Sequence, residues 1–213
     1  MKAIIAGLVL IAEVLDALPQ GTVIFNNRLG RTEHVYCGPY DGHLWLVGTT
    51  GGPLAGSTTY ASLLGISGYA RTDSGMVAGD LGTALGDGTA TNFRTGAAAG
   101  TIVATTATFS NIPRDAPTAT FEMVAWDNSS GLYSTWALAS VAWQDGLIYA
   151  GASGLFNFTV PIGGDVNTPP NWGNITPGQS TSFTIIFWPE PSTLGLFGLA
   201  VGVWAVMRGK RVR

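Results

Sequence analysis

The chain has 213 residues, a net charge of −3 and 11% charged residues, against about a quarter in an ordinary soluble domain. This length accommodates one core of ordinary size, and four of the ten basic residues crowd into the last six positions. The remaining cations are scattered, so the chain lacks the basic face that nucleic-acid binding requires, and its single cysteine, Cys37, excludes an intrachain disulfide.

Residues 1–17 have the pattern of a secretory signal peptide. A lysine at the second position precedes an apolar run over residues 3–12, and Ala17 is a small residue suited to precede a cleavage point. Two acidic residues lie in the cleavage region, which is usually neutral, so an uncut anchor and a buried helix are the alternatives. The pattern predicts export of the chain that follows.

Residues 21–188 alternate apolar and polar side chains between clusters of Gly, Pro, Asn and Asp, which is typical of strands and turns. Periodic runs of helix length are absent from this region. The candidate strands are Thr22–Phe25, Leu44–Val47, Tyr60–Ile66, Thr101–Phe109, Pro117–Trp126, Leu155–Val160 and Ser182–Phe187. Short strands in this number predict an all-β fold, a single antiparallel β-sandwich that is Ig-like or jelly-roll-like.

The clearest strand is Pro117–Trp126. Its side chains divide into two sets, Ala119, Phe121, Met123 and Ala125 on one face and Thr118, Thr120 and Glu122 on the other. Such alternation predicts an antiparallel strand with one buried face. The short connection 110–116 joins it to Thr101–Phe109, so we expect these two strands to pair as neighbours.

An apolar segment near the C-terminus, residues 194–207, predicts a transmembrane helix. At 1.5 Å rise per residue it spans about 21 Å, and snorkelling arginines extend its reach toward the roughly 30 Å of a bilayer core. Its large apolar side chains, the predicted membrane anchor, are Leu194, Leu196, Phe197, Leu199, Val201, Val203, Trp204 and Val206. The basic tail that follows contains Arg208, Lys210, Arg211 and Arg213. Positive residues stay in the cytoplasm, so the domain before the helix is expected outside.

Pro189, Glu190 and Pro191 precede this segment and are separated from it by two residues. Two prolines around a glutamate, then a short apolar helix and an arginine-rich end, resemble the PEP-CTERM sorting signal of Gram-negative bacteria, over residues 189–213. The resemblance implies recognition by exosortase, a membrane-embedded protease or transpeptidase, and cargo associated with exopolysaccharide and biofilm. It also implies an inner-membrane location before processing, and then the cell surface or the extracellular space. The prolines keep the segment extended, as a protease cleft requires.

Shorter stretches resemble a group of PEP-CTERM proteins from Verrucomicrobia and their relatives. These stretches are GTVIFNNR at 21–28, NFRTGAAAG at 92–100, VAWD at 124–127 and STW at 134–136. This resemblance implies a secreted β domain and carries no known activity.

The sequence offers little material for catalysis. There is no Gly-x-Ser-x-Gly motif, and His34 and His43 are the only histidines. His34, Cys37, Asp41 and His43 match no common metal spacing, and Asp80 and Asp87 match no calcium-loop spacing. We therefore expect no catalytic residues, no cofactor and no metal.

Aromatic residues gather between positions 126 and 149. Trp126, Tyr133, Trp136 and Trp143 are candidates for stacking on sugar rings, although such aromatics more often close the end of a core. The sequence thus predicts a non-catalytic, exported surface or matrix protein. A carbohydrate-binding module is the first alternative, and a secreted hydrolase that uses one of the histidines is the second.

Overall fold

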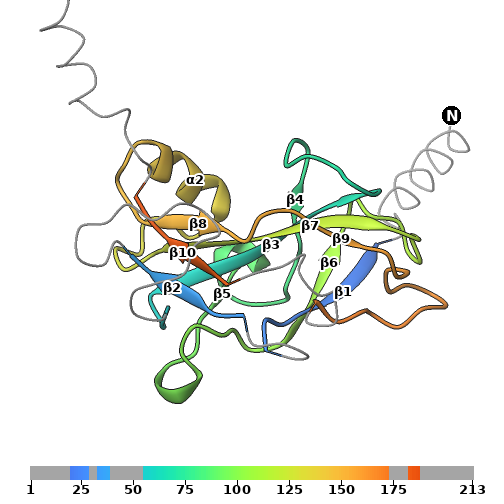
Figure 1. Ribbon diagram of the computed structural model, residues 1–213, viewed down its shortest axis with the longest axis horizontal. Helices are drawn as coiled ribbons and strands as arrows, with labels where there is room; N and C mark the ends of the chain where they lie inside the picture. Colours follow the sequence, from blue (N-terminus) through green and yellow to red (C-terminus); the bar gives the residue numbers. More distant parts are fainter. Residues whose placement is uncertain (1–19, 29–32, 39–54, 173–181, 188–213) are drawn as a thin grey trace, which may run out of the picture.

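The computed structural model describes residues 20–28, 33–38, 55–172 and 182–187, and the fold is rich in β-strands (Figure 1). The strands are β1 Gly21–Phe25, β2 Val35–Cys37, β3 Thr59–Ser67, β4 Val77–Ala78, β5 Thr91–Asn92, β6 Thr105–Phe109, β7 Ala119–Asp127, β8 Ala150–Ala152, β9 Phe156–Phe158 and β10 Phe183–Ile185. The helices are η1 Gly86–Gly88 and η2 Gly96–Ala98, both 3-10, and α2 Trp136–Gln144. Within these ranges no helix has the length and hydrophobicity that crossing a membrane requires.

The central sheet is built on the long antiparallel pair β3 and β7. These strands align from Thr59 opposite Asp127 to Ser67 opposite Ala119. On the outer edge of β7, β9 pairs with its first half and β8 with its second half. On the outer edge of β3 lie β4 and β5. Residues 119–127 therefore form the spine of the domain.

Two further pairs complete the β structure. β1 pairs with β6 in antiparallel fashion, and β10 lies parallel to β2. Because β2 and β10 are parallel, the prediction of a wholly antiparallel sandwich is wrong for this pair. The expected pairing of residues 101–109 with β7 is also wrong, because the partner of β6 is β1. The Phe109 ring of β6 instead packs against the Phe121 ring of β7, with 5.2 Å between centroids.

Most predicted strands are confirmed. β1, β3, β7, β9 and β10 fall within or overlap the expected segments at 22–25, 60–66, 117–126, 155–160 and 182–187. The segment 101–109 is a strand only from Thr105, because Thr101 belongs to a turn in which its amide donates to the Ala98 carbonyl at 3.2 Å. The candidate at Leu44–Val47 lies outside the described residues.

The predicted apolar face of β7 is confirmed as the main core, the cluster centred on Phe25, Phe109, Phe121, Phe156 and Phe158. The Phe121 ring lies 5.1 Å from Phe158 and 6.0 Å from Phe156. A Cβ on Gly65, which lies opposite Phe121, would fall 2.7 Å from that ring. Any larger residue at position 65 would collide with this ring, so a glycine is required on β3 opposite Phe121.

The other face of β7 is covered as well, contrary to the half-buried strand we expected. Val124 and Trp126 are fully buried in a helix-side core whose other members include Leu64, Ala139, Trp143 and Ile148. α2 lies over this face (Figure 1). The prediction of an all-β domain therefore missed the helix at residues 136–144. Their sequence, WALASVAWQ, is apolar almost all round and so shows no helical period.

Candidate ligand-binding cleft

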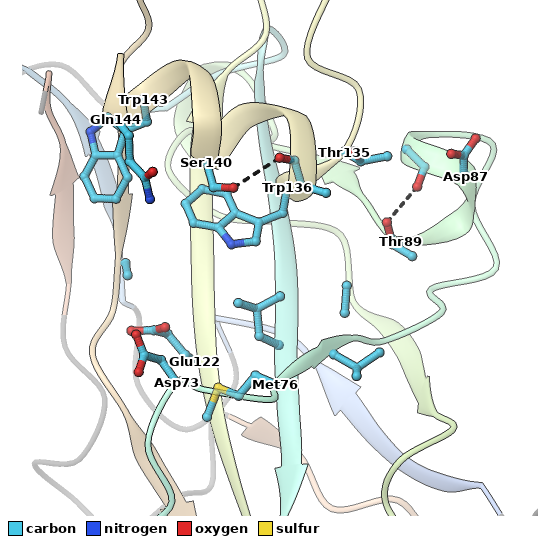
Figure 2. A pocket seen from close by; sticks show the side chains of 16 residues that line it. Asp73, Met76, Asp87, Thr89, Glu122, Thr135, Trp136, Ser140, Trp143 and Gln144 are labelled. Atoms are coloured by element: carbon cyan, nitrogen blue, oxygen red, sulfur yellow. Dashed lines mark hydrogen bonds between the residues drawn. The ribbon is translucent and has the colours of Figure 1, made fainter. Parts of the chain in front are cut away.

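A cleft of about 880 Å³ opens on the helix side of the central sheet (Figure 2). Leu64 and Glu122 line it from β3 and β7, and α2 forms a second wall. Its remaining lining residues are Asp73, Met76, Val77, Ala78, Gly86, Asp87, Thr89, Thr135, Trp136, Ala137, Ser140, Trp143, Gln144 and Ala152. Six separate segments of the chain therefore meet around one space.

Trp136, the first residue of α2, presents its indole toward the strands (Figure 2). Two other tryptophans pack against it, with ring centroids 5.8 Å away for Trp126 and 6.2 Å away for Trp143. Thr135 begins the helix as its N-cap, since its side-chain oxygen accepts a hydrogen bond from the Leu138 amide at 3.4 Å. A capped and packed helix start thus fixes an aromatic face in the cleft wall.

Glu122 and Asp73 lie on the same side of the cleft (Figure 2). Burial raises the pKa of Glu122 to about 7, and the nearby negative charge of Asp73 adds to this rise. Near neutral pH a large fraction of the Glu122 carboxyl is therefore protonated and can donate a hydrogen bond, which an ionised carboxylate cannot. The pair offers a ligand both a donor and acceptors.

Hydroxyl and amide groups, together with the carboxyl of Asp87, complete the polar part of the cleft. Thr89 donates to the Gly86 carbonyl at 2.6 Å, and Ser140 donates to the Ala137 carbonyl at 3.2 Å (Figure 2). Both hydroxyl oxygens keep acceptor capacity. Gln144, at the end of α2, adds an exposed side-chain amide. The cleft therefore combines an aromatic face with several uncharged polar groups.

The four aromatics expected to stack on sugars do not form one exposed platform. Trp126 is fully buried and its Nε1 donates to the Tyr133 carbonyl at 2.7 Å, so its faces are closed to a ligand. Trp143 is 8% exposed and its Nε1 donates to the Ile186 carbonyl at 2.8 Å. Tyr133 is half-buried and lies outside the cleft lining. Trp136 alone of the four is both partly exposed and in the cleft wall.

The residues weighed as metal ligands are not assembled into a site within the described ranges, where no three His, Cys, Asp or Glu side chains come together. Cys37 packs against the main core, and burial raises the pKa of its thiol. Asp80 accepts a hydrogen bond from the Gly82 amide at 2.8 Å, as a turn residue does. Asp41 and His43 lie outside the described residues.

The predicted sorting and anchor residues all lie outside the described residues, as do the signal peptide 1–17 and its Ala17. This holds for Pro189, Glu190 and Pro191, for the segment 194–207 and for the basic tail 208–213. The structure describes the chain only as far as Phe187 on this side. These assignments therefore stay predictions.

Sequence reasoning missed the meeting of Glu122, Asp73, Met76 and Gln144 around one cleft. One signal was present, because Glu122 is the only charged residue in the strand segment PTATFEMVAW. A lone carboxyl in an otherwise apolar and hydroxyl-bearing strand is costly to bury and so marks a place of interest. Its partner Asp73 belongs to a distant turn that carries no such mark.

Comparisons with protein-family models, with curated proteins and with solved structures find no match to this chain. The resemblance of residues 189–213 to a sorting signal accordingly remains a prediction. The chemistry of the cleft rests on its own lining, which includes the partly exposed indole of Trp136, the carboxyls of Glu122, Asp73 and Asp87, and several hydroxyl, amide and apolar groups.

Proposed function

We propose that this chain is a non-catalytic, exported surface protein whose domain binds a saccharide in the cleft beneath α2. The observation that supports binding is the Trp136 indole beside the carboxyls of Glu122 and Asp73 in one open cleft. An aromatic face packs against the C–H face of a sugar ring, and convergent polar groups fix its hydroxyls. Exopolysaccharide is the ligand of this kind that an exported protein meets.

The exported location is proposed from the two ends of the sequence. In this proposal residues 1–17 direct export, and 194–207 hold the protein in the inner membrane until an exosortase-type protease or transpeptidase acts at Pro189–Pro191. The position of the folded domain is compatible with this, because its last described residue, Phe187, stands two positions before Pro189. An extended recognition segment would then begin where the folded domain ends.

The finer architecture that we propose is a β-sandwich with a helix on its outer side. The β1–β6 pair and the central sheet enclose the main core, with Phe109 and Phe121 meeting from opposite layers. α2 covers the remaining face of β7. In this arrangement the cleft belongs to the helix-covered face, away from the main core.

A secreted glycoside hydrolase is the second candidate, and the carboxyl pair is the observation that favours it. Glycoside hydrolysis uses one protonated and one ionised carboxyl, and burial brings Glu122 to a pKa of about 7. Binding is the first choice because Asp73, the carboxyl beside Glu122, lies on the same side of the cleft, whereas hydrolysis needs its two carboxyls on either side of the scissile bond. The third carboxyl of the lining, Asp87, lies away from this pair. Release of reducing sugar that Glu122→Gln abolishes would establish the hydrolase.

Affinity electrophoresis of the full chain, in gels that contain the host's own exopolysaccharide, tests the binding proposal. Wild type is expected to be retarded, and Trp136→Ala to lose most of the retardation. Gln144→Ala, a change at an exposed position, should weaken it without affecting folding. Tyr69→Ala is the matched control, because Tyr69 is an exposed aromatic outside the cleft lining.

Retardation of wild type and folded Trp136→Ala to the same extent would reject the cleft as the binding site. Circular dichroism establishes that each variant is folded. Cell fractionation tests the exported location separately, because an intact product found only in the cytoplasm would contradict it. A truncation after Trp188 should then leave the membrane fraction.

A further inference from the structure

The outer side of α2 is apolar. The exposed residues of this helix are Ala137, Leu138, Val141 and Gln144, and only the last is polar. Leu138 is 51% exposed, Val141 is 58% exposed, and Leu147 just beyond the helix is 62% exposed. A surface helix ordinarily turns polar residues outward, and a helix that is apolar all round is covered by protein or lipid.

This outer side is not an alternative core face of a helix that could turn. Ala139, Ala142 and Trp143 already bury the inner side against β7 and β8. The cap at Thr135 and the hydrogen bond from Trp143 Nε1 to the Ile186 carbonyl fix the rotation of the helix. We call Leu138, Val141 and Leu147 the outer ridge. The residues that the structure describes leave more than half of each of these three side chains exposed.

The chain leaves the described domain beside α2. Ile186 bridges Ala150 and accepts the Trp143 hydrogen bond, and the Phe187 ring lies 3.8 Å from that of Tyr149. Figure 1 shows β10 ending below α2. Six residues, 188–193, then lead to the apolar segment. At about 3.1–3.5 Å per extended residue, the seven steps from Phe187 to Leu194 reach about 25 Å at most.

We propose that the outer ridge of α2 lies on the surface of the bilayer that residues 194–207 enter. This rests on the proposed membrane anchor, since a span that starts within about 25 Å of Phe187 keeps α2 close to the lipid. The chain has no Lys or Arg between Asp115 and Met207, so no positive charge from this stretch attracts anionic lipid headgroups. The contact is therefore hydrophobic and insensitive to salt.

The test uses the full chain in phosphatidylcholine vesicles, with an environment-sensitive fluorophore on Leu138→Cys. Val166→Cys is the matched control: Val166 is apolar, 87% exposed, and its amide donates to Asp115, beyond the opposite end of β7 from α2. The unsubstituted chain, with its partly buried Cys37, is the labelling blank. Val141→Cys provides a second position on the ridge.

The label at 138, and likewise at 141, is expected to shift to the blue and to lose most of its emission when the lipids carry a nitroxide near the headgroup. The label at 166 should change in neither respect. High salt should leave both results unchanged.

Three outcomes overturn the inference. Chains that float with the vesicles but show equal quenching at 138 and 166 reject the ridge contact alone and leave the anchor intact. Chains that do not float at all reject the anchor and the inference together. A blue shift at 138 that depends on protein concentration and resists the lipid quencher shows that a second copy covers the ridge instead.

Discussion

The two faces of β7 are buried by different partners, and only one of them was visible in the sequence. The main-core face, Ala119, Phe121, Met123 and Ala125, shows as apolar residues at every second position. The helix face carries Thr120, Glu122, Val124 and Trp126, and α2 lies over part of it. Alternation along a strand therefore reports the polarity of each face but not what lies above it. A mixed face can be covered when its polar groups find partners, as Thr120 does by donating to the Gly68 carbonyl at 2.9 Å.

The largest effect is expected on the main-core face. Phe121→Ala removes a fully buried ring that contacts three other phenylalanines, and it should lower the free energy of unfolding by about 3–5 kcal/mol. Urea denaturation measures this change. Val160→Ala, at a residue 46% exposed, should stay within about 0.5 kcal/mol of wild type. A loss no larger at Phe121 than at Val160 would show that this face is not the main core.

The next effect belongs to the helix face and depends on pH. In the unfolded chain Glu122 ionises near its ordinary pKa of 4.5, whereas in the folded protein its pKa is about 7. The unfolded chain thus releases the proton first, so the contribution of Glu122 to stability is fully present below about pH 4.5 and is lost as the pH rises through about 7. Glu122→Gln removes this loss, and it should be more stable than wild type by about 1–3 kcal/mol at about pH 8.

The same pair of proteins should have nearly equal stability at about pH 4, where both side chains are uncharged. Thermal melts at the two pH values measure the difference. Asp73→Asn is the companion variant, since removing its charge should recover part of the gain at high pH. A wild-type stability that does not fall between about pH 5 and pH 8 relative to Glu122→Gln would contradict a buried carboxyl on this face.

A smaller effect tests whether α2 is needed to cover the helix face. Thr135→Ala removes the N-cap, and because its hydrogen bond is long at 3.4 Å the loss should be about 0.5–1 kcal/mol. Hydrogen exchange should rise in α2 and not in β1 or β6. Thr135→Ser keeps the capping hydroxyl and should retain most of the stability. If hydrogen exchange in α2 is equal in Thr135→Ala and Thr135→Ser, the Thr135 hydroxyl does not stabilise the start of the helix that forms the cleft wall.

The smallest effect is expected at Asp115, just before β7 begins. Hydrogen bonds from the Asn167, Val166 and Asp165 amides lower the pKa of this carboxyl. A carboxyl whose pKa is lowered in the folded protein contributes stability at pH values above its ordinary pKa of 3.8. This stability is lost as the pH falls through the lowered pKa of the folded protein. Asp115→Ala should therefore loosen the loop 163–167 at neutral pH, as faster amide exchange, and the difference from wild type should shrink in acid. An unchanged loop at neutral pH would contradict the role of these hydrogen bonds.

Individual segments show why the sequence predicted most strands but not α2, the partner of β6 or the cleft. The alternation of Phe156 and Phe158, and of residues 119–125, carried the strand assignments because side chains of a strand alternate faces whatever its partners. α2 was not predicted because its sequence, WALASVAWQ, lacks a polar stripe. The pairing of β6 with β1 was not predicted because the sequence of Thr105–Phe109 does not indicate which strand it pairs with. The cleft escaped for the same reason, since Asp73 and Glu122 meet only after β3 and β7 have paired.

The sequence by itself determined that the domain is rich in β-strands, which strand positions face the main core, and that the chain carries apolar segments at both ends. These are local properties, because polarity and backbone preference are written residue by residue. Tertiary structure alone decided the strand partners, the covering of the second face of β7 and the raised pKa of Glu122. Each of these depends on which distant surface excludes water from a given side chain, and burial of that kind exists only after the chain has folded.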